Sequence, residues 1–527
     1  MSKVKELERS YREGRITRRE FLTRASALGL AVAISPTLLS GTVKAATPKK
    51  GGRLRIGISG GSTTDSLDPG TIADMMAQVA GRMSMNHLVE INHKNEPIPE
   101  LAESWEASPG AKKWIFKLRK GVEFHNGKTM DSEDVIFSIN HHRGEKSKSA
   151  AKGIVDPIVD VKADGKHTVV FTLREGNADF PYIISDYHLL IMPADTKDFN
   201  KGIGTGPYVL KNFEPGVRFF STKNPNYWKE GRGHFDEVEL LGISDINART
   251  NALKTGQIDV MNRCPRKTVH LLEKMRGIKV IRTDGNKHYT MAMLTNIKPY
   301  DNNDVRLALK YAIDREQFLK IILRGYGYVG NDHPIGRNQR YFAANLPQRH
   351  YDPDKAKFHL KKAGLEGHTF RFHTADGVFD GAVDGAVLYK EHAAKAGINI
   401  EIVKEPSDGY WSNVWIKKPW CMVFWSGRPT EDWMFSTAYA EDATWNDTKW
   451  KHDKFNQLLK TARAELNDAK RRDMYGEMQG IVRDEGGVVV PVFASDMAAS
   501  KDKVKFGTVA SDMELDGFRA PERWWFA

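Results

Sequence analysis

The stretch that most constrains the fold runs from Trp420 to Phe435 and reads WCMVFWSGRPTEDWMF. Its first six residues, Trp420–Trp425, are almost wholly apolar, and their length and aromatic content predict a strand buried on both faces. The pattern breaks at Ser426-Gly427, and Arg428 follows beside further aromatic residues. An α/β sheet presents ligand-contacting groups in this way, at the carboxyl ends of its strands. The alternative is a core strand that simply ends in a surface loop.

The length and composition place the chain among large water-soluble proteins. With 527 residues, 28% of them charged, it is long enough for two or more domains with sizeable cores.

The first 45 residues have the features of an export signal. Arg18-Arg19 precedes a mildly apolar run from Ala25 to Leu39, and Val43-Lys44-Ala45 offers a small-residue cleavage site. This order predicts a twin-arginine signal that an export receptor reads, and a retained membrane anchor is the alternative. No Cys follows the apolar run, so we expect a periplasmic protein that is not a lipoprotein.

The charge balance and the cysteine count exclude other classes. Residues 1–45 hold nine Lys or Arg and four Asp or Glu, so the rest of the chain has 70 basic and 63 acidic residues, about +7. This modest excess, without a long basic run, argues against a nucleic-acid partner. Cys264 and Cys421 lie far apart in the sequence, and we expect two buried thiols rather than a disulfide.

Strand-like and helix-like patterns alternate along the chain without an internal repeat, which indicates an α/β fold. The predicted strands cover residues 53–58, 114–118, 167–173, 208–213, 217–222, 369–373, 398–403, 420–425 and 488–493. The predicted helices cover residues 75–88, 132–142, 246–254, 304–313, 315–324, 354–363, 384–396, 454–466 and 469–484. Asp131, Asn303 and Asp314 are expected to cap three of these helices.

Several motifs in a fixed order carry a resemblance to a known family. They are the segment from Glu100 to Arg143, then Gly204–Tyr208, Asn224–Trp228, Val305–Leu309 and Tyr311–Arg315. The segment 100–143 closely resembles the signature of the family 5 extracellular solute-binding proteins. These are the dipeptide-, oligopeptide- and nickel-binding components of ABC importers. The resemblance spans nearly the whole chain after the signal.

The resemblance implies a two-lobed, type II periplasmic-binding-protein fold of the large peptide-binding class, with a ligand between the lobes. On this basis we expect lobe one at 46–296, with an inserted subdomain at about 90–230. Lobe two would cover 297–489, and residues 490–527 would return to lobe one.

The resemblance also identifies ligand-binding candidates. Peptide-binding relatives place an Asp shortly after the Trp of a W-x-x-D turn, where it pairs with the ligand's amine. Here Arg428 stands at that position, and a guanidinium favours a carboxylate or phosphate. Dipeptide relatives hold the ligand carboxylate with an Arg that falls here at Val383 or Asp384. One interpretation is therefore that the sites for the positive and the negative end of the ligand are exchanged in this chain. Alternatively, Arg428 pairs with Glu431 or Asp432, and Asp384 is a helix N-cap.

Other residues complete the predicted site. Ser426 and Gly427 belong to the turn itself, and Thr64 lies in the Gly- and hydroxyl-rich loop 59–70, which the resemblance favours as part of the cleft. Three aromatic residues would either pack around the ligand or belong to the core, namely Trp425, Tyr410 and Trp411.

Two motifs suggest enzymes but lack the required context. Gly57–Gly61 matches G-x-S-x-G, yet Ser59 is followed by loop rather than by an immediate helix. Gly325–Gly330 matches G-x-G-x-x-G but follows a helix instead of a strand. We therefore expect neither catalysis nor a dinucleotide cofactor, and no dedicated metal site.

The sequence thus predicts a non-enzymatic periplasmic binding protein that closes around a peptide or peptide-like small molecule with an anionic group. Its macromolecular partner would be an ABC permease at the inner membrane, and we expect a monomer. The alternatives are a binding protein for a sugar acid or an opine-type ligand, or an exported serine hydrolase that uses Ser59.

Overall fold

The predicted buried strand forms as expected, in a sheet of eleven strands. The computed structural model describes residues 48–407 and 409–527, so the predicted signal, with its cleavage site, lies outside the described residues. Strand β16 spans Trp420–Trp425, as predicted, and five of its six residues are buried. The sheet order is β15-β14-β16-β12-β17-β11-β1-β10-β9-β8, and β13 pairs with β17 off this path.

The remaining strands of this sheet are β1 (Arg53–Ile58), β8 (Tyr208–Glu214), β9 (Arg218–Lys223), β10 (Glu237–Gly242), β11 (Val260–Met261), β12 (Ile278–Met293), β13 (Gly327–Val329), β14 (Thr369–Thr374), β15 (Asn399–Lys404) and β17 (Val488–Lys501). The pairs β1–β10 and β14–β15 are parallel, whereas β12 is antiparallel to both β16 and β17. The sheet is therefore mixed.

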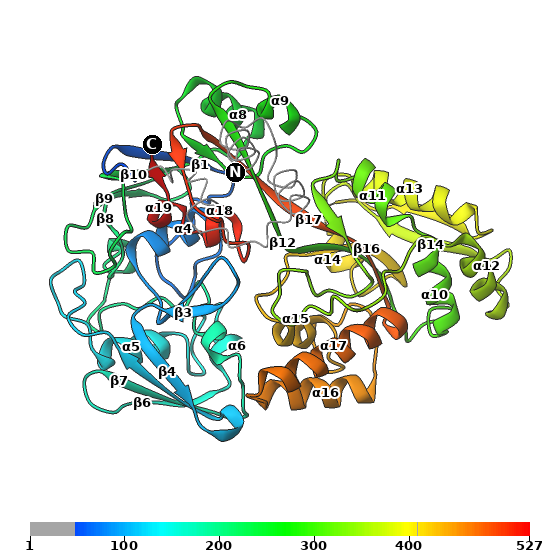
Figure 1. The fold of residues 1–527 in the computed structure, drawn as a ribbon, viewed down its shortest axis with the longest axis horizontal. Coiled ribbons are helices and arrows are strands. Elements are labelled where there is room, and N and C mark those ends of the chain that lie inside the picture. The colour runs from blue at the N-terminus through cyan, green and yellow to red at the C-terminus, as the bar shows by residue number, and fades with distance from the viewer. Residues whose placement is uncertain (1–47, 408) are drawn as a thin grey trace, which may run out of the picture. The chain divides into compact units, whose positions relative to one another are not determined.

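Two long antiparallel strands, β12 and β17, run side by side in this sheet (Figure 1). Their register runs from Ile278 opposite Lys501 to Ala292 opposite Val488, with an irregularity between Asp284 and His288. β12 and β17 thus join the part of the sheet that contains β16 to the part that contains β11 and β1.

A separate four-stranded sheet has the order β4-β5-β7-β6. Its strands are β4 (Ala102–Ala107), β5 (Lys113–Leu118), β6 (Ile158–Ala163) and β7 (Thr168–Leu173). Two small pairs join β2 (Val89–Ile91) to β3 (Pro97–Pro99) and β18 (Val504–Lys505) to β19 (Trp525–Phe526).

The longer helices are α4 (Met75–Ser84), α5 (Ser132–His141), α8 (Ile246–Thr255), α10 (Asn303–Tyr311), α11 (Arg315–Ile321), α12 (Pro353–Lys362), α13 (Ala382–Ala394), α15 (Glu431–Ala438), α16 (Asp453–Ala464) and α17 (Asp468–Glu485). The short helices are α6 (Lys152–Val155), α7 (Phe180–Ile183), α9 (Val269–Glu273), α14 (Tyr410–Asn413), α18 (Glu514–Gly517) and α19 (Ala520–Arg523). Of the helices that the structure describes, none is long and apolar enough to span a bilayer.

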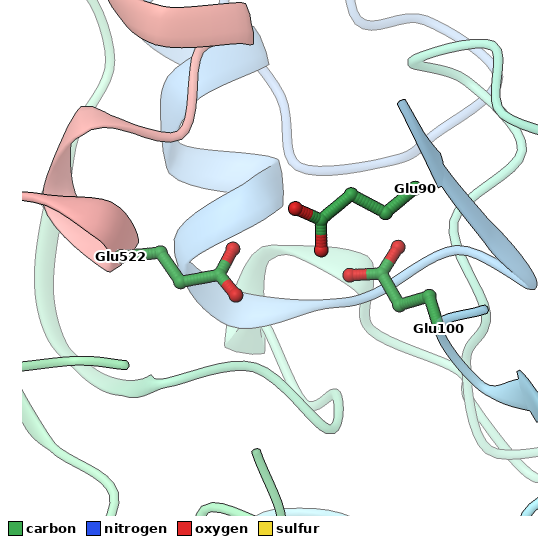
Figure 2. A group of neighbouring side chains, drawn as sticks. All are labelled: Glu90, Glu100 and Glu522. Atoms are coloured by element: carbon green, nitrogen blue, oxygen red, sulfur yellow. The ribbon is translucent and has the colours of Figure 1, made fainter. Parts of the chain in front are cut away.

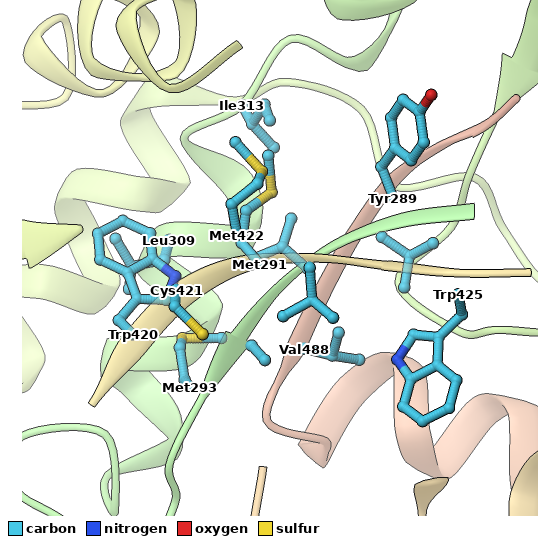
Figure 3. Packing of buried hydrophobic residues seen from close by; sticks show 14 of the residues in the cluster. Tyr289, Met291, Met293, Leu309, Ile313, Trp420, Cys421, Met422, Trp425 and Val488 are labelled. Carbon is cyan, nitrogen blue, oxygen red and sulfur yellow. The ribbon is translucent and has the colours of Figure 1, made fainter. Parts of the chain in front are cut away.

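Three large hydrophobic cores account for most of the buried apolar residues. One core lies around β16 and is drawn entirely from residues 289–494. Figure 3 shows Trp420 and Met422 of β16 packed with Met291 of β12. A second core fills residues 88–191 around the four-stranded sheet, and a third combines residues 54–83, 208–281 and 504–526.

The predicted helix caps are partly correct. Asp131 caps α5, and the Asp134 side chain accepts a bond from the Asp131 backbone N–H, which completes a capping box. Asp314 caps α11 as predicted. The prediction for Asn303 is wrong by one residue, because the Asn302 side chain accepts the bond. The α13 cap is also not Asp384 but Gly381, whose φ of 91° favours glycine.

Candidate functional site

The main candidate site is a cavity of about 1040 Å³ at the ends of β1 and β16. Ser59 directly follows β1, and Ser426 directly follows β16, and both line the cavity. Other parts of the lining come from α4, the segment 185–188, residues 263–266, β12, residues 378–380, the segment 424–445, β17 and residues 512–518. Carboxyl ends of strands thus meet at this cavity, as the sequence pattern predicts.

Three of the eight predicted ligand-contacting residues line the cavity: Ser426, Gly427 and Arg428. Gly427 has a φ of +84°, and a Cβ there would lie 2.7 Å from the carbonyl oxygen of Asn286. Only glycine fits this approach without displacing the backbone. The close contact fixes the turn that carries Arg428.

The other predicted residues lie outside the cavity lining. Tyr410 belongs to the core, and its hydroxyl donates to the carbonyl of Met422 at 2.9 Å. Trp411 is 40% exposed, and Thr64 and Asp384 are exposed as well. Trp425 is buried behind the lining.

The Arg428 guanidinium is half-buried and has few partners. Its Nη1 donates to the carbonyl of Gly427 at 2.7 Å, and its charge lies 5.8 Å from the centre of the Trp425 ring. Burial lowers the pKa of Arg428, and the nearby Asp186 and Tyr187 partly offset that effect. Of the residues that the structure describes, no carboxylate lies within ion-pair distance of this group.

Glu431 and Asp432, the two acids that the sequence offered as ion-pair partners of Arg428, bind other groups. Glu431 accepts a bond from the backbone N–H of Tyr341 at 2.7 Å. Asp432 pairs with Arg463 at 3.1 Å. Arg428 therefore pairs with neither Glu431 nor Asp432 in this structure, and its side chain bonds the carbonyl of Gly427 in its own turn.

An aromatic cluster supports the base of this turn. The indole N–H groups of Trp415 and Trp425 donate to one oxygen of Asp447 at 3.3 and 3.2 Å. Asp447 is buried, and burial raises its pKa to about 6. Trp445 packs against both rings and lines the cavity, with 47% of its surface exposed. One face of the cavity is therefore aromatic.

Sequence reasoning missed several charged residues of the lining. Arg82 lies on α4, Arg266 precedes α9, Asp380 precedes α13 and Asp512 precedes α18. Cys264 also lines the cavity, and it and Cys421 are buried free thiols, as predicted. A single arginine in the otherwise apolar segment MMAQVAGRMS was the one signal available for Arg82.

Ser59 does not have the surroundings of a nucleophile elbow. Its backbone N–H donates to the Asn262 side chain at 2.8 Å, and the next long helix begins only at Met75. A nucleophile elbow needs an immediate strand–turn–helix.

Three buried carboxylates, those of Glu90, Glu100 and Glu522, approach one another closely enough to suggest a metal site (Figure 2). However, Lys229 contacts Glu100 at 3.2 Å and Glu522 at 3.0 Å, and Arg519 contacts the same two at 2.7 and 2.9 Å. Burial opposes the ionisation of Glu90, but these cations outweigh burial and hold its pKa below the usual range. The cluster is an internal ion network.

The fold is that of the type II periplasmic binding proteins. The periplasmic binding protein DppA from Helicobacter pylori, solved in complex with the peptide STSA, superposes with a TM-score of 0.72 at 25% identity, over 91% of this chain and 98% of that chain. HbpA2 from Haemophilus parasuis superposes with a TM-score of 0.80 at 20% identity, over 90% and 100%.

The chain belongs to the bacterial extracellular solute-binding proteins, family 5, whose middle region matches residues 96–447. Di/tripeptide-binding protein 1 of Pseudomonas aeruginosa is 27% identical over 501 residues, covering 86% of this chain and 91% of that protein. The expected family and fold class are thus confirmed, and the family consists of binding proteins rather than enzymes.

Proposed function

We propose that this protein is the periplasmic substrate-binding component of an ABC importer and captures a peptide or peptide-like small molecule with an anionic group. Family membership supports the class, and the relative named as a di/tripeptide-binding protein supports the ligand type. The cavity of about 1040 Å³ is of the size that small ligands occupy.

The proposal that the ligand has an anionic group rests on the burial of Arg428 and on its lack of an acidic partner among the described residues. The side chain lines the cavity, is partly removed from water, and is without an acidic partner among the described residues. A buried guanidinium gains most from a charge-assisted, bidentate bond to a carboxylate or phosphate. A ligand anion supplies that bond.

Capture would proceed by hinge closure of two lobes. Lobe one would comprise 46–296 and 490–527, with the inserted subdomain at about 90–230, and lobe two would comprise 297–489. The separation of the buried residues into a core of residues 289–494, a core of residues 88–191 and a third core supports a division of this kind, although the first core extends a few residues beyond both ends of the proposed lobe two. β12 and β17 cross the proposed boundary and would act as the hinge, and the closed form would dock on the permease.

The remaining features of the proposal come from the sequence. The protein would be exported by its twin-arginine signal, lack a lipid anchor and act as a monomer. A sugar acid or an opine-type acid would also satisfy Arg428 and is the alternative ligand class. A hydrolase that uses Ser59 is disfavoured by the missing elbow and by the family of binding proteins.

The test is to identify the small molecules that the purified protein releases on denaturation, by mass spectrometry, and to titrate them back. Arg428→Met should weaken binding at least about tenfold, or ~1.4 kcal/mol. Arg371→Met is the matched control, because that arginine is exposed on β14 and, among the residues that the structure describes, its ion-pair partner is Glu401 alone. A released sugar or opine acid would establish the alternative ligand class, and equal affinities of both variants would refute the role of Arg428.

A further inference from the structure

The proposed inserted subdomain and the proposed lobe two meet at a buried ion pair. The carboxylate of Asp179, directly before α7, lies 2.8 Å from the guanidinium of Arg471 on α17, and the two side chains are 6% and 4% exposed. Among the residues that the structure describes, each is the other's ion-pair partner. Phe180 of α7 belongs to the core of residues 88–191, whereas Tyr475 of α17 belongs to the core of residues 289–494. The pair therefore joins two parts of the chain that have separate cores.

Lobe two holds the Arg471 side chain in position for this contact. Its Nε atom donates to the carbonyl of Ala462 at 3.2 Å. Its charge lies 5.1 Å from the centre of the Tyr341 ring and 5.4 Å from the centre of the Tyr475 ring. These three partners belong to lobe two and are uncharged, so the carboxylate that neutralises the buried guanidinium comes from the subdomain. A buried charge without an opposite charge is strongly unfavourable, and Arg471 is therefore buried favourably only when Asp179 is beside it.

A backbone bond and a close approach extend the same interface. The N–H of Ala178 donates to the carbonyl of Arg463 at 2.7 Å. That carbonyl belongs to the last turn of α16, where carbonyls have no partner within the helix. Gly176 lies beside Ala464, because a Cβ at this glycine would be 3.1 Å from the Cβ of Ala464. The subdomain thus completes the end of a helix in lobe two.

A second contact joins the same two parts at the turn between β2 and β3. The Nδ2 atom of Asn95 donates to the carbonyl of Asn338 at 2.9 Å. The hydroxyl of Tyr182, on α7, donates to the carbonyl of Asn95, also at 2.9 Å. Tyr182 lines the main cavity, whereas Asp179 and Arg471 are not part of the lining. The two contacts are therefore linked through α7, and the ion pair lies apart from the ligand.

We propose that Asp179 and Arg471 form a latch that closes the inserted subdomain onto lobe two whether or not a ligand is bound. This inference rests on the hinge closure in the proposed function. Opening exposes both side chains to water, which solvates each charge, so the pair separates without leaving a charge buried. Because neither side chain lines the cavity, the strength of the latch is set independently of the chemistry of the ligand.

The competing explanation is a permanent interface that holds the subdomain and lobe two together in every state of the protein. With a permanent interface, a change at Asp179 lowers the stability of the fold but leaves the distance between the two parts unchanged. With a latch, the same change increases the fraction of molecules in which the two parts are separated.

The test measures the distance between two spin labels by double electron–electron resonance. The purified protein is first freed of bound small molecules by unfolding and refolding. The labels are attached to Lys162→Cys on β6 and Lys460→Cys on α16, because both positions are exposed and lie on the two parts in question. Cys264 and Cys421 are buried and should remain unlabelled under native conditions. The ligand-free wild type should contain a closed population.

The variants separate the latch from a permanent interface. Asp179→Asn should lower the ratio of closed to open molecules at least about tenfold, because the closed form would bury a guanidinium without a counter-charge. Asp156→Asn is the matched control and should leave the ratio unchanged, since Asp156 pairs with Arg174 within the subdomain and both side chains are exposed. Asp179→Asn combined with Arg471→Met should recover part of the loss, because no buried charge is then left without a partner.

A milder variant keeps the test available if Asp179→Asn does not fold. Asn95 has a φ of 59°, which glycine adopts readily, so Asn95→Gly removes the bond to Asn338 without straining the turn. It should lower the ratio of closed to open molecules by about two- to tenfold, as expected for one lost hydrogen bond.

Two results would overturn the latch. Equal ratios of closed to open molecules in the wild type and in the Asp179→Asn and Asn95→Gly variants would establish a permanent interface. A ligand-free wild type that is entirely open would show that closure needs the ligand. A released ligand that is not peptide-like would refute the proposed ligand class and leave the latch standing. One unchanged distance in every variant, with and without the released ligand, would refute both the latch and hinge closure.

Discussion

Replacing Asp447 by Asn should make the protein more stable at neutral pH. Asp447 is 3% exposed, and its carboxylate accepts the indole N–H groups of Trp415 and Trp425. Burial raises its pKa to about 6, from the ~3.9 of an unfolded chain. This difference in pKa corresponds to ~3 kcal/mol of folding free energy that is lost when Asp447 ionises.

The sign follows from proton binding. Because its folded-state pKa is raised, the folded protein holds a proton on Asp447 more strongly than the unfolded chain does. Stability from this group is therefore present below pH ~4 and is lost as the pH rises through about 6. Asn cannot ionise but keeps an acceptor oxygen for the indoles.

The assay is urea unfolding of the wild type and of Asp447→Asn at pH 4 and at pH 7. The free energy of unfolding of the variant relative to the wild type should increase by ~2–3 kcal/mol between these pH values. Asp376→Asn, on an exposed side chain paired with Lys404, is the control and should change stability by less than ~0.5 kcal/mol. A variant that is less stable than the wild type by the same amount at both pH values would refute the reasoning.

Two further variants test a buried ion cluster and the turn that carries Arg428. Asp332→Ala should destabilise the protein by ~3–5 kcal/mol in urea unfolding, because buried Arg315 and Arg349, at 2.6 and 2.8 Å, would lose their shared carboxylate; a loss below ~1 kcal/mol would contradict this. Gly427→Ala should cost at least ~1–2 kcal/mol and weaken ligand binding, since its Cβ would meet the backbone of Asn286; unchanged affinity would show that the turn tolerates displacement.

The bounds of a strand could be predicted from the sequence where a single hydrophobic pattern extends over the whole strand. β1 and β16 have the predicted bounds, because each is a short run of apolar or alternating residues between turn signals. β12, which spans Ile278–Met293, was missed. Its middle, Asp284 to Lys287, is polar and irregular in register, so no local period marks a 16-residue strand.

Helix α15 was missed for a related reason. Thr430, Glu431 and Asp432 look like a polar turn, but Thr430 is the N-cap, and the two acids occupy the first helical turn. The same residues that suggest a loop are those that start a helix. Only the aromatic residues that follow, and the tertiary packing, distinguish the two cases.

The candidate site was predictable only in its local part. Ser426, Gly427 and Arg428 follow a recognisable strand, so their place at the cavity could be inferred. Arg82 and Asp512 line the same cavity although more than 400 residues separate them in the sequence, and that placement depends on how the third core folds. For Tyr410 the sequence left both a ligand contact and a core position open, because a core aromatic and a cleft aromatic look alike in sequence, and the structure buries this side chain.

The role of Arg428 as the anion-binding group is tested most directly by a crystal structure of the protein with the ligand that it releases on denaturation. An acidic oxygen of that ligand should lie ~2.7–2.9 Å from the Arg428 guanidinium, with the ligand enclosed in the cavity. A ligand bound elsewhere, or an Arg428 side chain that points into solvent while the cavity is filled, would contradict it.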